Sequence, residues 1–245
     1  SLNNESKSEI NNTYSLGLFN VNSNNWQSLF NSYILEKPLF NFNTYYDKLS
    51  NSFLIFGGYS DFKFRNDFLK FKLNTNVFEK ISFKGDNIPP RFKSGLGMTK
   101  RNSLLIYGGE GNLSGDESIG KIPFNDLFEV NLKDLSVKRL WNLSTDYNHN
   151  SISENLILNV SEEYFYCLVY NGKEESISLK KVSIENGEEI YLGRNINFNT
   201  SIIANNFNLF YEQKNNRLYA YTKEFLDNRL EKNIISFYSI EMEPL

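Results

Sequence analysis

Two segments of the chain, residues 53–58 and 104–109, repeat one pattern, an apolar run that ends in a pair of glycines. The first reads Phe-Leu-Ile-Phe-Gly-Gly and the second Leu-Leu-Ile-Tyr-Gly-Gly, and the glycine pairs are 51 residues apart. Each copy is followed by Asn-Asp and an alternating apolar stretch, at residues 66–73 and 125–132. Because short apolar runs and alternation with period two favour strands, the pattern predicts a chain built from repeated β units.

A period near 50 residues made of strands is typical of β-propellers, in which each unit is a four-stranded antiparallel sheet. Turn residues between the apolar runs place the strands of the two clearest units. In the first unit the strands are predicted at residues 42–48, 53–57, 67–74 and 77–83, and in the second at 93–99, 103–108, 126–132 and 136–141. The predicted fold class is therefore all-β.

Weaker copies of the unit are found by aligning the ends of the third strands. The aligned positions are spaced by 52, 59, 52 and 56 residues, and they are Val21, Leu73, Leu132, Ile184 and Ile240. This regularity predicts five units, with second strands at residues 165–170 and 217–221 in the last two. It gives about 17 strands, too few for five complete four-stranded units. We therefore expect either an additional strand within residues 3–14 or an incomplete part of a larger ring.

The organisation along the chain is otherwise simple. Residues 1–14 form a polar, Asn-rich lead, and residues 15–245 are predicted to form one domain. Residues 223–233 are expected to form a helical turn or two within a loop. The net charge is −3, which provides no basic field for a phosphate backbone, so nucleic acid is not expected as a partner. No run of 18 apolar residues is present, and no membrane span is expected in this segment.

The chain has one cysteine and one histidine. Cys167 lies in the apolar run of residues 164–170, which predicts a buried and inert thiol. His149 lies in the polar run of residues 146–150, which is typical of a solvated loop residue. One imidazole and one buried thiol do not supply the ligand clusters of zinc or copper sites, nor a Ser-His-Asp or Cys-His pair. No metal, cofactor or catalytic residue is therefore expected.

The strand ending in Gly-Gly, the following Asn-Asp and the spaced aromatic residue at Trp26 or Phe78 resemble the kelch repeat family. Residues 85–91 are similar to the linker that precedes each kelch blade. The resemblance is specific over residues 40–143, and it implies a β-propeller with blades of four antiparallel strands. Kelch repeats often place Gly-His-Ser after the Pro-Arg pair, whereas this chain has Phe-Lys-Ser-Gly at residues 92–95.

The run of residues 88–98 also resembles kelch-type sensory domains attached to bacterial signalling or transcription proteins. This narrower resemblance implies the sensory or scaffold part of a longer polypeptide. It favours an extracytoplasmic location over a cytoplasmic one. It also implies a role in recognition.

The loops that leave the second strands, residues 58–66 and 109–125, are the longest, which makes them the expected binding rim. Together with the Pro-Arg linker, they supply aromatic and charged candidates for ligand contact: Tyr59, Asp61, Phe64, Arg65, Arg91, Lys93, Glu110, Asp116 and Glu117. Simpler interpretations stay open for these residues. The first loop can pack on its neighbour, the arginine of the linker can bond backbone carbonyls between blades, and the acidic residues can be turn formers.

Two functions fit these patterns. The first is a non-catalytic domain that recognises a protein or a small ligand such as a glycan. The alternative is a carbohydrate-active enzyme that uses acidic residues of the propeller face. That enzyme would need two carboxylates about 5–10 Å apart across a pocket.

Overall fold

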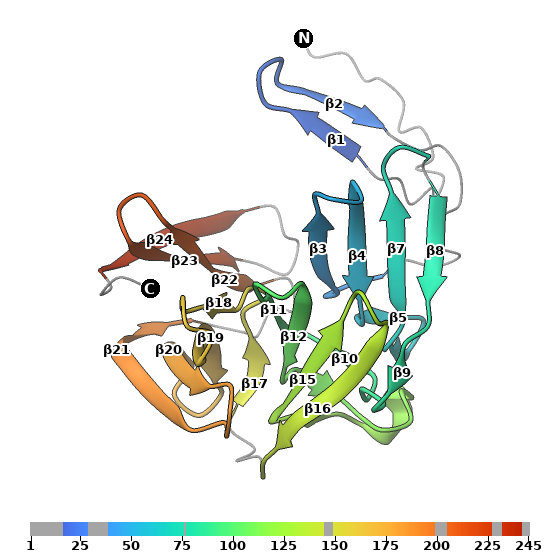
Figure 1. Cartoon of the computed structure of the whole chain (residues 1–245). Coiled ribbons are helices and arrows are strands. Elements are labelled where there is room, and N and C mark those ends of the chain that lie inside the picture. Colours follow the sequence, from blue (N-terminus) through green and yellow to red (C-terminus); the bar gives the residue numbers. More distant parts are fainter. Residues whose placement is uncertain are drawn as a thin grey trace.

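The computed structural model describes residues 17–28, 39–75, 77–144, 149–198, 205–226 and 232–241. Over these ranges the chain is all-β, as predicted, and most of its strands pair antiparallel (Figure 1). The helical structure within them is one 3-10 turn, η1 (Glu117–Ile119). None of the described residues belongs to a helix long and apolar enough to cross a membrane.

The two clearest sequence units each form a sheet in which the strands follow one another in chain order. The first sheet contains β3 (Asn43–Asp47), β4 (Ser52–Phe56), β7 (Phe68–Lys72) and β8 (Val77–Ile81). The second contains β11 (Gly95–Met98), β12 (Ser103–Tyr107), β15 (Asp126–Asn131) and β16 (Ser136–Asn142), with β9 (Lys84–Gly85) parallel to its edge. The eight predicted strands are confirmed to within a few residues at their ends.

The later units are also sheets. The third sheet contains β17 (His149–Ile152), β19 (Tyr164–Asn171), β20 (Ser176–Ser183) and β21 (Glu189–Asn197), and β18 (Ile157–Leu158) pairs with β19 as well. The fourth contains β22 (Asn206–Glu212), β23 (Arg217–Phe225) and β24 (Asn233–Glu241). A separate hairpin is formed by β1 (Gly17–Asn20) and β2 (Asn25–Ser28). The predicted second strands of the last two units are confirmed as β19 and β23.

The helical turn expected at residues 223–233 is wrong at both of its ends. Strand β23 continues to Phe225, and β24 begins at Asn233, which pairs directly with Phe225. The sheet ladder satisfies the backbone groups that a helical turn would have satisfied locally. The residues between 227 and 231, and the extra strand expected within 3–14, lie outside the described residues.

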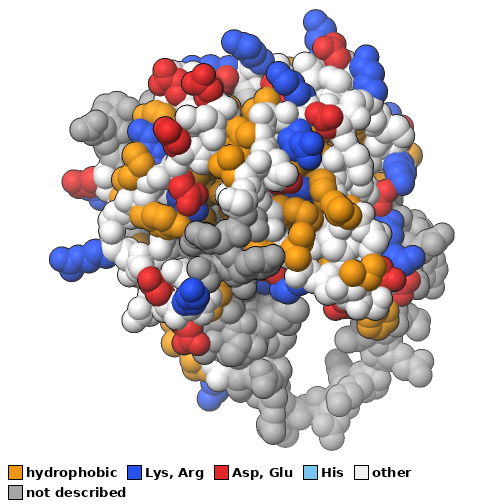
Figure 2. Space-filling model, turned by 90° about the horizontal axis from the view of Figure 1, so that it is seen from below, with side chains coloured by type: hydrophobic (Ala, Val, Ile, Leu, Met, Phe, Trp, Pro, Cys, Tyr) orange, Lys and Arg blue, Asp and Glu red, His pale blue; other side chains and the backbone are white. Residues whose placement is uncertain are grey.

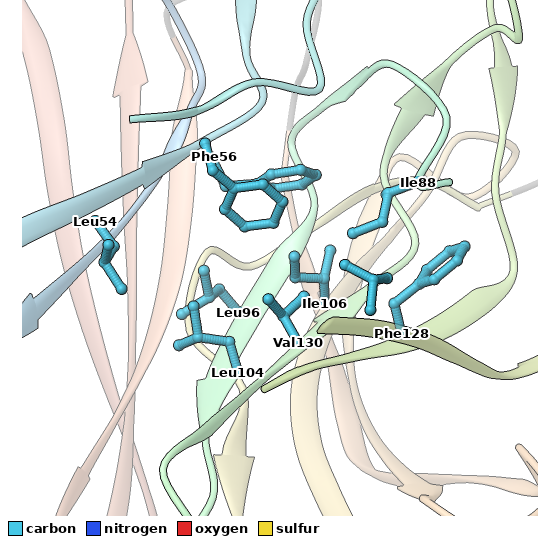
Figure 3. Packing of buried hydrophobic residues seen from close by; sticks show 10 residues of the cluster. Leu54, Phe56, Ile88, Leu96, Leu104, Ile106, Phe128 and Val130 are labelled. Atoms are coloured by element: carbon cyan, nitrogen blue, oxygen red, sulfur yellow. The ribbon is translucent and has the colours of Figure 1, made fainter. Parts of the chain in front are cut away.

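Successive sheets pack face to face through hydrophobic clusters. The cluster between the first and second sheets is shown in Figure 3, and its buried members are Leu54, Phe56, Phe68, Ile88, Leu96, Leu104, Ile106, Phe128, Val130 and Val137. Figure 3 shows side chains from both sheets pointing into this shared layer. Burying each large apolar side chain stabilises the fold by roughly 1.5–3 kcal/mol. The alternating apolar residues of the repeats therefore form the layer that joins one unit to the next.

The next two interfaces between sheets are also apolar. Leu105 and Leu127 of the second sheet pack against Phe165 and Val169 of the third sheet. Trp141 joins this layer, and its Nε1 donates a hydrogen bond to the carbonyl oxygen of Ile184 at 2.9 Å. The third and fourth sheets share a cluster of ten buried residues: Tyr166, Leu168, Tyr170, Ile177, Leu179, Phe198, Phe207, Leu209, Leu218 and Ala220.

The innermost strands of the four sheets lie side by side near the centre of the molecule, where β3, β11, β18 and β22 come together in Figure 1. In the third sheet this innermost position is shared by β17 and β18, which both pair with β19. Asn43 Nδ2 donates to the carbonyl oxygen of Ser94 at 2.7 Å, which ties β3 to the residues just before β11. Leu96 and Asn155 form an isolated parallel bridge, and Asn155 Nδ2 donates to the carbonyl oxygen of Leu209 at 3.1 Å. As a result, the loops that follow the second strands lie at one end of the molecule.

The paired glycines turn the chain out of the second strand. Gly108 and Gly109 have φ of 58° and 93°, in the left-handed region that favours glycine. A Cβ at Gly109 would lie 2.7 Å from the carbonyl oxygen of Phe92, so the backbone of the linker that precedes this unit passes too close for a side chain. The glycine pair of the first unit, Gly57 and Gly58, has the same conformation with φ of 65° and 98°.

Candidate functional site

The two predicted rim loops pack on each other. Each contains short paired strands: β5 (Tyr59–Ser60) with β6 (Lys63–Phe64) in the first, and β13 (Glu110–Gly111) with β14 (Ile122–Pro123) in the second. The linker strand β10 (Arg91–Phe92) pairs with β13. The loops are therefore ordered by hydrogen bonding, where the sequence indicated irregular segments.

Several direct bonds join the two loops. Phe64 N donates to the carbonyl oxygen of Gly115 at 2.7 Å, and Glu117 N donates to that of Phe62 at 3.1 Å. The Tyr59 hydroxyl donates to Glu117 Oε2 at 2.6 Å, and this bond raises the pKa of the tyrosine. Tyr59, Phe64 and Glu117 are thus brought together, and at this point the loops pack locally, as one interpretation of the sequence expected.

Asp116 has a structural partner as well. Its carboxylate accepts a hydrogen bond from Ser118 N at 2.9 Å and caps η1. Hydrogen bonding to Ser118 lowers the pKa of Asp116. An acidic N-cap of this kind satisfies an orphan backbone donor.

Phe92 lies at the centre of the rim. Its ring stacks on that of Phe64, with 5.4 Å between centroids and 5° between planes, and Tyr59 is 6.4 Å away. Two ammonium groups approach the Phe92 ring, with Lys121 Nζ 5.3 Å and Lys93 Nζ 5.8 Å from its centroid. The sequence did not indicate a role for Phe92 or Lys121, because only the fold brings these two residues together.

Glu110 is the buried anion beneath this cluster. Its side chain is 4% exposed, Ser151 Oγ donates to Oε1 at 3.0 Å, and Lys121 forms an ion pair with Oε2. Burial lowers the pKa of Lys93, and the positive charge of Lys121 lowers it further. The negative charge of Glu110 raises the pKa of Lys93 and so opposes both effects. Glu110 therefore pairs directly with Lys121, and both of its oxygens are occupied by protein groups.

A small polar cavity of about 30 Å³ lies next to the rim, where the central ends of the sheets meet. Its lining includes Lys93, Ser151, Glu154 and Asn206, which come from the linker of the second unit and from the third and fourth sheets. Burial raises the pKa of Glu154, and a hydrogen bond with Asn206 partly opposes that effect. The cavity is too small for a drug-sized ligand, whose pockets are typically several hundred Å³.

The outer surface of the two loops carries exposed apolar side chains. Their exposed fractions are 74%, 79%, 69% and 46%, for Phe62, Leu113, Ile119 and Ile122 respectively. Figure 2 looks onto this end of the molecule and shows apolar side chains in several groups among acidic and basic ones. Sequence reasoning did not select Leu113, Ile119 or Ile122, although apolar residues inside a Gly- and Ser-rich loop are themselves a signal of exposure.

Arg91 and Arg65 are not part of this exposed apolar surface. Arg91 is fully buried, and its guanidinium donates to the carbonyl oxygens of Pro89 and Gly108 and to Asp126. The structure therefore places Arg91 in the interior, where it cannot contact a ligand, and it bonds carbonyls as the simpler interpretation described. Arg65 forms an ion pair with Asp67 at 2.8 Å, and Asp61 is exposed on the first loop.

Cys167 and His149 are placed by the third sheet. Cys167 is fully buried, and burial raises the pKa of its thiol to about 12, as expected of an inert cysteine. The backbone of His149 begins strand β17 and pairs with Asn171, so its expected place in a loop is wrong. Over the described residues, no group of three or more His, Cys, Asp or Glu side chains is arranged to hold a metal ion.

Comparison with known proteins finds no protein-family model that matches the chain and no curated protein that matches it.

Proposed function

We propose that this chain is a kelch-type β-propeller region of about five units, and that it recognises a protein through the surface of residues 58–66 and 109–125. Four successive sheets packed face to face, with their first strands together at the centre, support the propeller reading. The left-handed glycine pairs that lead from the second strands of the first two units into the rim loops also support it.

One observation carries the recognition proposal. Four large apolar side chains, Phe62, Leu113, Ile119 and Ile122, are exposed on two loops that hydrogen bonds hold against each other. Exposed apolar groups rimmed by charged side chains are characteristic of protein interfaces, where apolar anchors supply most of the binding energy. Because the loops are already ordered, little conformational entropy is lost on binding.

The carboxylates of the rim support a non-catalytic role. Glu110 is held by Ser151 and Lys121, Glu117 by Tyr59, and Asp116 caps η1. A glycosidase needs one carboxylic acid and one carboxylate that face the substrate. On this basis we propose binding without turnover, in the sensory or scaffold part of a larger protein.

Site-specific photocrosslinking tests the proposal. A benzoylphenylalanine probe at position 62 or 119 is expected to capture one and the same partner protein in extract of the source cells. The matched control is position 49, because Leu49 is 92% exposed in the turn between β3 and β4, at the opposite end of β4 from the rim. Capture at positions 62 and 119, with none at 49, is the expected result.

Two results would contradict the proposal. Equal capture of that partner at position 49 would show that the rim does not select it. Hydrolysis of any member of an oligosaccharide panel, abolished by Glu110→Gln or Glu117→Gln, would favour the carbohydrate-active enzyme instead.

A further inference from the structure

The fourth sheet has one strand fewer than the sheet that it covers. The third sheet runs β17-β19-β20-β21, whereas the fourth runs β22-β23-β24, so β24 is its edge in the described part of the chain. The apolar face of the third sheet extends as far as β21, since Leu192 and Ile196 pack against the shared cluster. Beyond β24, the described residues leave part of that face uncovered.

A groove of about 890 Å³ lies at this position. Its floor is formed by Leu168, Leu179, Leu192 and Ile196 of the third sheet, and Tyr238 and Ile240 of β24 line its side. This is the space that the fourth strand of a complete sheet would occupy. Adjacent strands in a sheet lie about 4.8 Å apart, so a strand paired with β24 would lie directly over β21.

The edge of β24 has none of the usual features that prevent strand pairing. Its nine residues, Asn-Ile-Ile-Ser-Phe-Tyr-Ser-Ile-Glu, include no proline, glycine or lysine. Ile234, Ile235 and Phe237 are 51%, 52% and 74% exposed. Natural edge strands normally carry lysine, proline or a bulge, because an unprotected edge is a template for another strand.

The charge of the groove is positive. Lys181 and Arg194 line it, and Lys181 Nζ lies 3.5 Å from the centroid of the Tyr164 ring. The one acidic residue of the lining, Glu241, already accepts from Arg217 Nη2 at 2.6 Å. A strand that enters the groove therefore meets an apolar floor interrupted by two cations.

We propose that an extended segment of a partner protein pairs with β24 as the fourth strand of this sheet. Its inward side chains are apolar, and one of them is acidic and faces Arg194 and Lys181. Strand addition of this kind takes its affinity from main-chain hydrogen bonds and its specificity from alternate side chains. The site is separate from the rim proposed above, and neither proposal depends on the other.

A second copy of the chain fits this edge less well. Pairing two β24 strands antiparallel places the inward faces of both sheets on the same side. Each copy would then bring its own third sheet into the layer beneath the joined strands. The third sheets of the two copies would overlap there. A single strand fits without that conflict.

The test uses two fluorescent peptides and the full chain. The first peptide, Ile-Thr-Glu-Thr-Val-Thr-Ile, has apolar and acidic residues on one side, and the second replaces its glutamate with lysine. Fluorescence anisotropy is expected to show saturable binding of the glutamate peptide, and Arg194→Glu is expected to weaken it by at least tenfold while it strengthens binding of the lysine peptide. Amide hydrogen exchange of residues 233–241 is expected to slow when the glutamate peptide is bound.

Lys223→Glu is the matched control. Lys223 lies on β23 next to the buried Thr222, so its side chain points to the other face, where its Nζ is 4.6 Å from the centroid of the Phe225 ring. This variant is expected to bind both peptides as the original chain does. The proposal is overturned if neither peptide binds at about 1 mM, a concentration that detects even weak complexes. It is also overturned if Arg194→Glu and Lys223→Glu behave alike, or if the chain alone sediments as a dimer through β24.

Discussion

Arg91 and Asp126 form a buried bidentate ion pair, with Nη1 to Oδ1 at 2.6 Å and Nη2 to Oδ2 at 2.9 Å, and their side chains are 0% and 4% exposed. The backbone of the same arginine accepts a hydrogen bond from Gly58 N at 2.8 Å, and its Nη1 donates to the carbonyl oxygen of Gly108 at 2.9 Å. One residue therefore joins the glycine turns of two consecutive units.

We expect Asp126→Ala to lower the free energy of unfolding by about 3–5 kcal/mol, because it leaves the Arg91 charge buried without a partner. The matched control is Asp67→Ala, at the same place in the preceding unit, where the partners Arg65 and Lys80 are 43% and 66% exposed. Exposed pairs contribute at most about 1 kcal/mol. Urea unfolding of both variants measures the difference, and equal losses would show that the buried pair has no special role.

Gly109→Ala is expected to destabilise the protein more than Gly120→Ala. Both glycines have positive φ, 93° and 88°, so each substitution carries a backbone penalty of about 1–3 kcal/mol. At Gly109 the new Cβ also meets the carbonyl oxygen of Phe92, whereas at Gly120 nothing lies within 4 Å. We expect a further loss of about 1–3 kcal/mol at Gly109. Thermal and urea unfolding measure the loss of stability in each variant. Equal losses in the two variants would show that the linker can move aside.

Glu154→Gln is expected to stabilise the protein at pH 7. Burial raises the pKa of Glu154 above its ordinary value of 4.5, so the folded state binds this proton more tightly than the unfolded chain does. The wild-type protein therefore loses stability as the pH rises through the interval above 4.5, and the loss is absent below it. The glutamine variant lacks this loss, so its advantage should appear between pH 4.5 and 7 and vanish below pH 4.

Urea unfolding across this pH range tests whether the glutamine variant is the more stable of the two proteins. Asn206→Ala is the companion variant, because it removes the hydrogen bond that opposes the effect of burial, and it should steepen the pH dependence. A wild-type protein that is more stable than Glu154→Gln at pH 7 would show that the carboxylate is stabilised by its surroundings.

Cys167 is expected to resist thiol reagents in the native state. Its pKa of about 12 leaves almost no thiolate at pH 8, and the side chain is fully buried. Labelling by an aromatic disulfide should therefore be roughly a hundredfold or more slower in buffer than in urea. In a Ser114→Cys variant, the added thiol on the exposed rim loop should react at once. Equally rapid labelling of Cys167 without denaturant would mean that the third sheet opens readily.

Much of the fold could be predicted because its signals are local. The alternation of residues 66–73 and the paired glycines after β4 and β12 depend only on the geometry of one strand and one turn. Strands β4, β7, β12 and β15 therefore lie close to where they were expected. The helical turn at residues 223–233 was wrong at both of its ends, because the pairing of β23 with β24 there outweighs a weak local preference.

The candidate site was predicted only in outline. The sequence indicated which loops form the rim, and it selected Tyr59, Phe64, Glu110 and Glu117, which the structure brings together. It did not show that Arg91 is buried whereas Lys93, two residues further along, lies at the rim. It also did not indicate Phe92 and Lys121, whose environment is formed by two different loops.

The sequence alone determined the all-β class, the repeated unit and the position of most strands, since these follow from patterns over a few neighbouring residues. Only the tertiary structure decided which charged groups lie in the interior, which apolar side chains face solvent, and which strand forms the edge of the fourth sheet among the described residues. Those properties depend on the packing of segments about 50 residues apart or more, and a side chain's exposure is set by the segments that cover it.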